Sequence, residues 1–410
     1  MCIRSSRNLP IKVIALLLLT VAAVAAGAAA ATAELEFSGW EEALIGQILE
    51  RFNREHPDIR ISLVSGNSDQ ILARMAAGTG PDVYRVSWAE FTPWMRQGLA
   101  LDLTPYIDRD KEELKLEEIF PGALTPFQMN GRQYAMPHHI GGNLMYINLE
   151  RLAAAGLALP REDWDWNDFV EVARRTTLDR ENDGRIDVWG FVNPNGWQFW
   201  IGHIESNGTR VFDGDVPAFN FNNQGTRDTM QFIYDLVHVH RGAPGPSERP
   251  NGPQAWQGGN AAMVMSPATP QWSQVPFERT VLPNPTGSVR RVMPGGPQPL
   301  AINPASEYKE EAWTFLKWIN RHEIQAWISL DLDLYPPTRR TVVPLIDDPI
   351  LRVFGMELEN QLVYTTMLHN DVLRVFNRHL DAVLRNEEAI PAAAEQVHHE
   401  LSVLVQEALK

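Results

Sequence analysis

Residues 34–65, ELEFSGWEEALIGQILERFNREHPDIRISLVS, contain the pattern that decides the fold class. Residues 35–37 form a short apolar run, and residues 59–64 form a second one. Between the two runs, apolar residues recur at the spacing of one helix face: Leu44, Ile45, Ile48, Leu49 and Phe52. A strand, a helix and a strand in this order predict a βαβ unit and an α/β fold.

The same alternation continues along the chain. Ser68 and Asp165 are residue types that favour helix N-caps, so helices are expected to begin at these two positions. Further elements are expected at residues 68–78, 82–86, 133–136, 144–148, 166–176, 261–265 and 307–321, with helices again after residue 348. Residues 243–299 are rich in Pro and Gly, so this stretch is expected to be rich in loops, which often line binding sites.

Composition and charge exclude several function classes. The chain has 410 residues, 44% hydrophobic and 21% charged, which is typical of a folded protein of two to three domains. Acids outnumber Lys and Arg by 51 to 36, and the resulting net charge of −15 argues against a nucleic-acid-binding surface. Because Cys2 is the single cysteine, we expect no disulfide, no thiolate metal site and no cysteine nucleophile.

Residues 1–33 have the three zones of a secretory signal peptide. Three cations are followed by an apolar stretch at 13–24 and by small residues that end at Ala33, where we expect cleavage. A membrane anchor is the alternative, but it needs about 18 strongly apolar residues. Cleavage removes three cations and no acids, so 33 cations against 51 acids leave −18. No later segment is apolar enough to span a bilayer, so we expect a soluble periplasmic protein.

Two segments resemble metal sites only in part. Residues 179–187, DRENDGRID, place acids at alternate positions before Gly184 as a calcium loop does, but the twelfth position holds Gly190 and not a bidentate Glu. We therefore favour a turn rich in Asp and Asn over a calcium site. His138 and His139 could begin a metal site, but no third ligand stands at a recognisable spacing. We expect neither metal nor cofactor, and a hydrogen-bonding or structural role for this histidine pair.

Motifs of catalysis are absent from the sequence. It contains no Gly-x-Ser-x-Gly elbow, no phosphate-binding loop and no dinucleotide-binding glycine pattern. Acid pairs exist among 51 acids, but none stands in a motif that would select it. The sequence therefore does not support an enzyme, and a secreted enzyme that acts on glycans is kept as an alternative.

The thirteen Trp residues point to carbohydrate as the ligand. An indole face can stack on the C–H face of a sugar ring, and its N–H can donate one hydrogen bond. Four of them stand among apolar neighbours and are expected in the core: Trp256, Trp313, Trp318 and Trp327. Four others stand at strand ends or in loops rich in Gly, Asn and Pro, and are candidate ligand contacts: Trp40, Trp88, Trp197 and Trp200.

The order of several short motifs resembles the extracellular solute-binding proteins of ABC importers, the family that includes maltodextrin and glycerol-3-phosphate binders. The motifs are FNREHPDI at 52–59, AGTGPDV at 77–83, LDLTPYI at 101–107, GRQYAMP at 131–137, LMYIN at 144–148, DWNDF at 165–169, GGNAAM at 258–263 and AWTFL at 312–316. The last-but-one of these is similar to the family's Gly-Lys-x-Ala-Met element, with Gly259 and Asn260 replacing its usual residues.

This resemblance implies an α/β fold of two lobes, joined by a hinge, with a ligand cleft between them. Chain crossings are expected near residues 139–143, 296–301 and 335–341. The implied boundaries are 34–139 plus 301–335 for lobe 1 and 140–300 plus 336–410 for lobe 2. The ligand contacts that the resemblance implies are Trp40, Trp88, His138, His139, Trp197, Trp200, Ser266, Gly295, Gly296 and Tyr335.

The implied function is a monomeric receptor that captures a neutral sugar or oligosaccharide and delivers it to the permease subunits of an ABC transporter. A receptor for a polyol phosphate such as glycerol 3-phosphate is the alternative within the same family. Such a ligand needs cations in the cleft, and Arg339 and Arg340, beside the last crossing, are the candidates in the sequence.

Overall fold

The βαβ unit predicted from residues 34–65 is present. The computed structural model describes residues 32–39, 42–210, 212–213, 218–268, 270–332, 335–362 and 369–408. In it, β1 (Ala33–Gly39) pairs in parallel with β2 (Ile59–Ser65), and α2 (Glu42–Glu55) connects the two strands. On α2, Phe52 packs edge-on against Phe315 and Trp318, at ring-centroid distances of 5.0 and 5.3 Å.

A continuous sheet runs through the molecule in the order β2-β1-β3-β12-β6-β10-β7, with β11 on β6 and β13 on β12. The remaining strands of this sheet are β3 (Val83–Tyr84), β6 (Met136–Asn148), β7 (Trp189–Phe191), β10 (Ala261–Pro267), β11 (Arg279–Leu282), β12 (Met293–Ile302) and β13 (Gln361–Leu362). Two short hairpins lie outside it: β4 (Gln128–Met129) with β5 (Arg132–Gln133), and β8 (Phe212–Asp213) with β9 (Ala218–Phe219).

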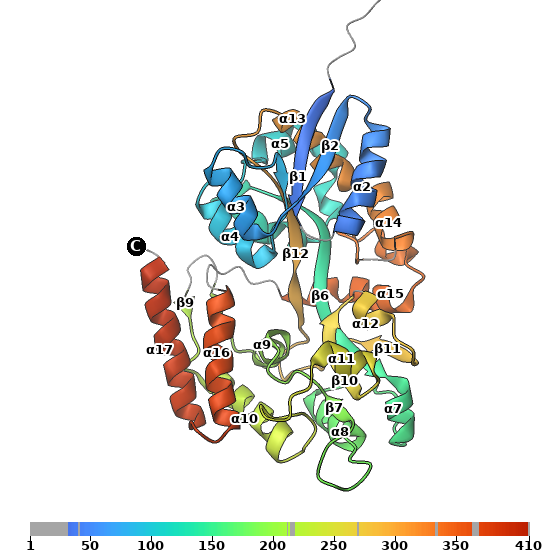
Figure 1. The fold of residues 1–410 in the computed structure, drawn as a ribbon, viewed down its shortest axis with the longest axis vertical. Coiled ribbons are helices and arrows are strands. Elements are labelled where there is room, and N and C mark those ends of the chain that lie inside the picture. The colour runs from blue at the N-terminus through green and yellow to red at the C-terminus, as the bar shows by residue number, and fades with distance from the viewer. Residues whose placement is uncertain are drawn as a thin grey trace, which may run out of the picture.

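The helices gather into two lobes above and below a narrow waist (Figure 1). The upper lobe holds α2, α3 (Ser68–Ala76), α4 (Trp88–Arg96), α5 (Thr104–Leu114), α13 (Lys309–Ile319) and α14 (His322–Leu330). The lower lobe holds α7 (Leu149–Ala154), α8 (Trp166–Thr176), α9 (Trp197–Ser206), α10 (Gln224–His238), α11 (Gly252–Gln257), α12 (Pro270–Ser273), α15 (Pro349–Glu357), α16 (His369–Leu384) and α17 (Ile390–Ala408). The short α6 (Pro121–Leu124) precedes β4.

Two long antiparallel strands connect the lobes. The 13-residue β6 and the 10-residue β12 run through the waist side by side (Figure 1). The sequence suggested two separate strands here, at 133–136 and 144–148. The structure corrects this to one strand, because Gly141 and Gly142 take part in the ladder with β12. A third connection passes from α14 in the upper lobe to α15 in the lower lobe.

These three connections contain the residues where crossings were expected, at 139–143, 296–301 and 335–341. The lobe boundaries at 139/140, 300/301 and 335/336 remain our proposal. The expected signal peptide lies almost wholly outside the described residues. Among the helices that are described, none combines the length and the apolar character that crossing a bilayer requires.

Helix ends follow the sequence in one case and depart from it in another. Asp165 caps α8, accepting hydrogen bonds from the backbone N–H of Asn167 and Asp168 in a capping box, as predicted. Ser68 was predicted as the cap of α3, but Asn67 holds that position and accepts from the N–H of Gln70. Since Asn and Ser are about equally good caps, the sequence did not separate the two neighbours.

The expected core tryptophans are placed inside the lobes. Trp256, Trp313 and Trp318 are buried, at 0, 1 and 0% exposure, and Trp327 is half-buried against the same core. Buried indole N–H groups need acceptors, and those of Trp256, Trp313 and Trp318 have them. Trp318 donates to the Glu55 carboxylate at 2.7 Å, and Trp313 donates to Asp110 at 2.7 Å.

Candidate binding site at the waist

Glycines form the part of the two connecting strands that lies at the waist. Gly295 pairs with Gly142, and Gly296 pairs with Gly141, so the two strands carry no side chain over this stretch. A methyl group on Gly295 would lie 2.4 Å from the carbonyl oxygen of Gly141, so the strands approach each other as only glycine permits. The expected backbone-contact residues Gly295 and Gly296 therefore stand between the lobes.

Trp88 and Trp197 come from different lobes and meet at this level. Trp88 is the first residue of α4 in the upper lobe, and Trp197 is the first residue of α9 in the lower lobe. Their ring centroids are 6.2 Å apart with an interplanar angle of 56°. Ser87 caps α4 in a capping box with Glu90, which fixes the start of the helix and thus the position of Trp88. We name Trp88 and Trp197 the interlobe aromatic pair.

His138, His139 and Tyr335 form a second group on the first and third connections. His139 stacks on the ring of Tyr335 at 3.8 Å and 18°. The Gln298 carbonyl can only accept, so Nδ1 of His138 donates to it over 3.3 Å. Nε2 of His138 then accepts from Nδ1 of His139 at 2.7 Å. This relay leaves Nε2 of His139 as an acceptor, which suits a hydroxyl group as its donor.

Burial keeps both histidines neutral. Desolvation lowers the pKa of His138 and of His139 well below the usual value, and the positive charge of Arg85 lowers both further. The two side chains are 1 and 3% exposed. Neutral imidazoles in a fixed tautomer act here as hydrogen-bonding groups and not as cations.

Arg85 is a residue of this region that sequence reasoning missed. It directly follows β3, is 1% exposed, and its Cβ lies 3.0 Å from where a methyl group on Gly39 would stand. Its backbone N–H donates to the Ser38 carbonyl at 2.9 Å. The available signal was its place after a strand of the parallel sheet, at the edge where ligands bind in α/β folds.

Two of the predicted contacts, Trp200 and Ser266, pack inside the lower lobe. Trp200, expected in a loop, lies inside α9; it is 0% exposed and stacks on Phe376 of α16 at 4.0 Å and 20°. Ser266, near the end of β10, is 2% exposed and pairs with Leu144 in the ladder with β6. The structure therefore places Trp200 in the lower-lobe core, away from a loop. Trp40 lies outside the described residues.

The segment that resembles a calcium loop forms a turn. Both carboxylate oxygens of Asp179 accept backbone N–H groups, from Asp183 at 3.3 Å and from Gly184 at 2.8 Å. Asp183 accepts from the N–H of Arg185 in the same way. These acids thus serve the backbone of their own loop. Within the described ranges, no group of three or more His, Cys, Asp or Glu side chains is arranged to hold a metal ion.

The cations suggested for an anionic ligand are engaged elsewhere. Arg339 is 3% exposed, pairs with Glu118 at 2.9 Å and donates to the carbonyl groups of Asn320 and Leu114. Arg340 lies 3.5 Å from Glu359 and stands over the ring of Phe120. Arg339 lines a polar hollow of about 450 Å³ between α5 and α14, a place in the upper lobe without any of the predicted contacts.

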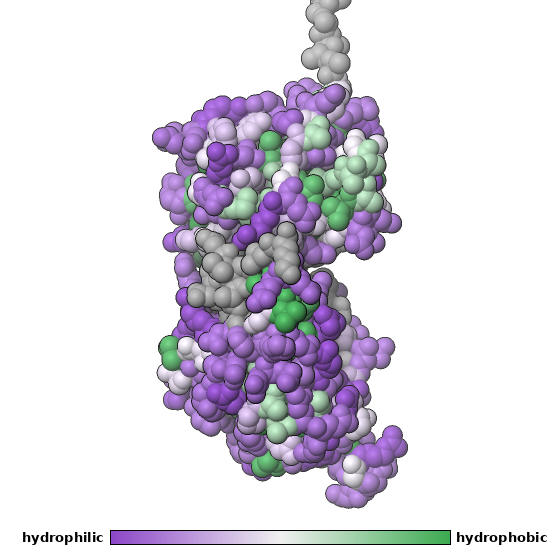
Figure 2. Space-filling view, turned by 90° about the vertical axis from the view of Figure 1, so that its left-hand side faces the viewer, coloured by the Kyte–Doolittle hydropathy of each residue, from purple (hydrophilic) through white to green (hydrophobic). Residues whose placement is uncertain are grey.

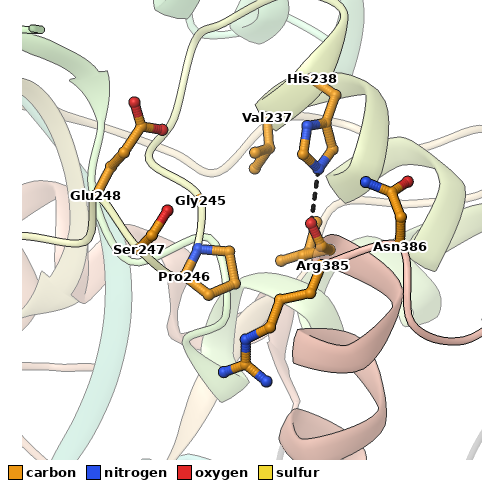
Figure 3. Close-up of a pocket in the computed structure, with 9 residues that line it drawn as sticks. Val237, His238, Gly245, Pro246, Ser247, Glu248, Arg385 and Asn386 are labelled. Atoms are coloured by element: carbon orange, nitrogen blue, oxygen red, sulfur yellow. Dashed lines mark hydrogen bonds between the residues drawn. The ribbon is translucent and has the colours of Figure 1, made fainter.

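Another hollow, of about 320 Å³, opens in the lower lobe between the end of α10, residues 245–248 and the turn between α16 and α17 (Figure 3). His238 donates across it to the carbonyl of Leu384 at 2.9 Å. None of the predicted ligand contacts lines it. Seen from the side of α17, the right-hand outline of the molecule has a notch between the upper and the lower lobe (Figure 2).

Comparisons with known proteins agree with this architecture. An arabinooligosaccharide-binding protein of Bacillus subtilis (strain 168) is 24% identical over 243 residues, which cover 56% of this chain and 53% of the relative. The chain thus spans about half the length of the curated relatives it matches.

Two solved structures share the fold. One is an ABC substrate-binding protein of Listeria monocytogenes in complex with cycloalternan, with a TM-score of 0.79 and 18% identity, covering 92% of this chain and 99% of that one. The other is maltose-bound MalE3 of T. maritima, with a TM-score of 0.72 and 22% identity, covering 91% of this chain and 100% of that one. The model of the family described as bacterial extracellular solute-binding protein matches residues 34–326, and the chain belongs to that family.

Proposed function

We propose that this protein is the substrate-binding receptor of an ABC transporter and that it captures a neutral sugar or oligosaccharide. The observation that carries the proposal is the interlobe aromatic pair, in which Trp88 from one lobe and Trp197 from the other meet at 6.2 Å beside the connecting strands. A ligand that enters between two indoles of opposite lobes contacts both lobes at once.

The chemistry around the pair suits sugar hydroxyls. Indole faces supply apolar stacking surface for the C–H face of a ring. Neutral His139 offers an acceptor to a hydroxyl group, and the glycines of the waist let backbone groups approach a ligand closely. Polar groups of this kind orient a neutral ligand without requiring a charge on it.

Binding and delivery follow from a hinge equilibrium. A solute that touches both lobes makes more contacts when the lobes are closed, so it shifts the population toward closure. A permease that binds the closed form in preference to the open form can then distinguish loaded from empty receptor. No bond of the solute is broken in this cycle, so we propose no enzymatic activity.

The relatives support this choice of ligand class. The Bacillus subtilis protein is named for arabinooligosaccharide binding, and the two structural neighbours hold cycloalternan and maltose. We further propose that the protein works as a monomer in the periplasm, without metal or cofactor, and that its partner is a membrane permease.

A thermal-shift screen of mono- and oligosaccharides tests the proposal. A ligand that binds only the native state must raise the melting temperature, by an amount that grows with concentration. We expect at least one neutral sugar to raise it and to change the Trp fluorescence. Melting curves that stay unchanged across the sugar panel while glycerol 3-phosphate shifts them would establish the polyol-phosphate receptor instead.

One observation keeps the polyol-phosphate alternative in view. The charge of buried Arg85 reaches both waist histidines, so a cation does lie in this region, although Arg339 and Arg340 are engaged elsewhere. A ligand bound through that charge would lose affinity as salt is raised, less than at an exposed site, whereas neutral sugar binding would not. Incubation with oligosaccharides for a day, followed by chromatography, tests the enzymatic alternative, which predicts cleaved products.

A further inference from the structure

The connecting strands contain a stretch without side chains. Gly141 and Gly142 of β6 pair with Gly296 and Gly295 of β12, so four glycines share one level of the ladder. Glycine has the widest backbone freedom of all residues and adds no packing of its own, so a ladder made of it resists bending less than its neighbours do. At this level the two strands have no side chains that would resist bending.

Above the glycines, a buried glutamine ties two connections together. Gln325 of α14 is 1% exposed; its Nε2 donates to the His138 carbonyl at 3.0 Å, and its Oε1 accepts from the Thr338 N–H at 2.8 Å. The first and third connections are thereby held to the upper lobe. His138 also donates to Gln298 on β12.

Below the glycines, two asparagines hold the strands. Nδ2 of Asn143 donates to the Pro294 carbonyl at 2.9 Å. Nδ2 of Asn284 donates to the carbonyl groups of Asn143 and Val292, at 2.8 and 2.9 Å. Both asparagines are buried. Side-chain hydrogen bonds therefore brace the strands on each side of the glycine level, where the strands are held by their own ladder.

Trp88 lies directly on this glycine level. A methyl group built on Gly296 would stand 2.6 Å from Cγ and Cδ2 of the Trp88 indole, which is closer than real contacts allow. Trp88 thus lies on α4 of the upper lobe and packs its indole on Gly296 of β12. The same indole contacts Trp197 of the lower lobe.

The hinge of the proposed function passes through the paired glycines 141–142 and 295–296, the joint of the two strands. We propose that Trp88 is a positioning residue seated on this joint, an inference that rests on the proposed function only for the existence of the hinge. When the strands bend at the glycines, the seat of Trp88 changes, and with it the contact to Trp197. Trp88 then sets the resting angle between the lobes in the absence of any ligand.

A distance measurement between the lobes tests this on the full chain without ligand. Cysteines for spin labels are placed at Leu72 on α3 and at Val239 after α10, which are 37 and 65% exposed, in a Cys2→Ser background that has no other cysteine. Pulsed electron–electron double resonance then gives the distribution of distances between the two labels, and so between the lobes. The variants are Gly296→Ala, Gly141→Ala, Trp88→Ala, and Gly296→Ala combined with Trp88→Ala.

The variants have different expected outcomes. Gly296→Ala drives a methyl group into the indole, so the mean distance should shift; with Trp88→Ala present, the added methyl should cause no further shift. Gly141→Ala is the matched control, because its methyl group meets only the Gly296 carbonyl, at 3.3 Å. It restricts the backbone without touching Trp88, so the distribution should narrow around the wild-type mean.

Two results would overturn the proposal. One is a Gly296→Ala shift of equal size with and without Trp88, which places the effect in the strands alone. The other is a distribution of interlobe distances in Trp88→Ala that equals that of the wild type. The proposal expects a broader distribution in this variant, because the indole that packs on the glycines is missing. This second test needs no change in the strands, so it stands even where Gly296→Ala does not fold. Sugar binding is not used in either test, so the proposed function stands or falls separately.

Discussion

Trp197 and Trp200 lie one helical turn apart on α9, yet they belong to different regions. Trp197 opens the helix and faces Trp88 of the other lobe, whereas Trp200 is sealed against Phe376 of its own lobe. The sequence around them is the same short apolar segment. The comparison teaches that one helix can present an indole at the contact between the lobes and another inside the core, so that sequence neighbours of the same type can have different surroundings.

Trp200→Ala should have the largest effect on stability. Truncating a fully buried Trp leaves a cavity and costs about 3–5 kcal/mol. We expect the urea midpoint and the melting temperature to fall clearly, with sugar still binding to the fraction that is folded. Phe376→Ala removes the other ring of the stack and should behave alike. An unchanged melting temperature combined with a loss of sugar binding would contradict this prediction and would show that Trp200 serves binding and not the core.

Acid should lower the free energy of unfolding, because several histidines are buried as neutral groups. Burial lowers the pKa of His203 to about 3, and it lowers those of His138 and His139 well below the usual value. Their folded pKa values lie below the unfolded one, so the stability they contribute is present above about pH 6.5 and is lost as the pH falls.

At pH 5 the buried neutral His203 should cost the fold about 2 kcal/mol relative to pH 7, and His138 and His139 should act in the same direction. Urea unfolding at both pH values measures this. In His203→Asn, part of the pH dependence should vanish; the exposed His399→Asn is the matched surface control. An unchanged slope in His203→Asn would mean that this imidazole becomes protonated inside the fold.

Trp197→Ala should affect binding more than stability. Because Trp197 is half-buried at a helix start, its loss should leave the melt of the ligand-free protein nearly unchanged. Removal of one stacking face should weaken sugar binding about tenfold, which corresponds to about 1.4 kcal/mol. Calorimetric titration with the sugar found in the screen measures it. A collapse of the fold in this variant would erase the distinction between the two ends of α9.

Asp165→Ala should have the smallest effect. It tests whether a loss of stability inside the lower lobe changes sugar binding. Loss of this helix cap should cost about 1 kcal/mol of unfolding free energy. Asp165 caps α8, and this helix lies in the lower lobe away from the waist (Figure 1), so affinity for sugar should not change. Asp165→Asn keeps a capping side chain and should restore most of the loss. A drop in affinity would indicate that core stability and binding are coupled.

Local patterns predicted much of the fold. The periodicity of residues 34–65 predicted the βαβ unit, and Asp165 predicted the start of α8. Two local errors have physical reasons. Asn67 and Ser68 are both good caps, and Gly141 and Gly142 have low intrinsic strand propensity although the ladder with β12 includes them.

The site was less predictable than the fold. Trp88, His138 and Tyr335 were named as candidates from the sequence, and their arrangement around the waist came from the structure. Arg85 was missed, because a single Arg after a strand has no local mark of burial. Trp200 was misplaced in a loop, because its three-residue spacing from Trp197 fits a helix face as well as a loop.

By itself, the sequence determined the alternation of strands and helices, the family, and the wealth of indole that suits sugars, because periodicity and composition are local properties. Only the tertiary structure decided which tryptophans meet across the waist, which histidine donates to which, and why four glycines share one level. Those facts depend on residues that are up to 160 positions apart, as in the bond from His138 to Gln298. Such contacts are created by packing, which no local pattern encodes.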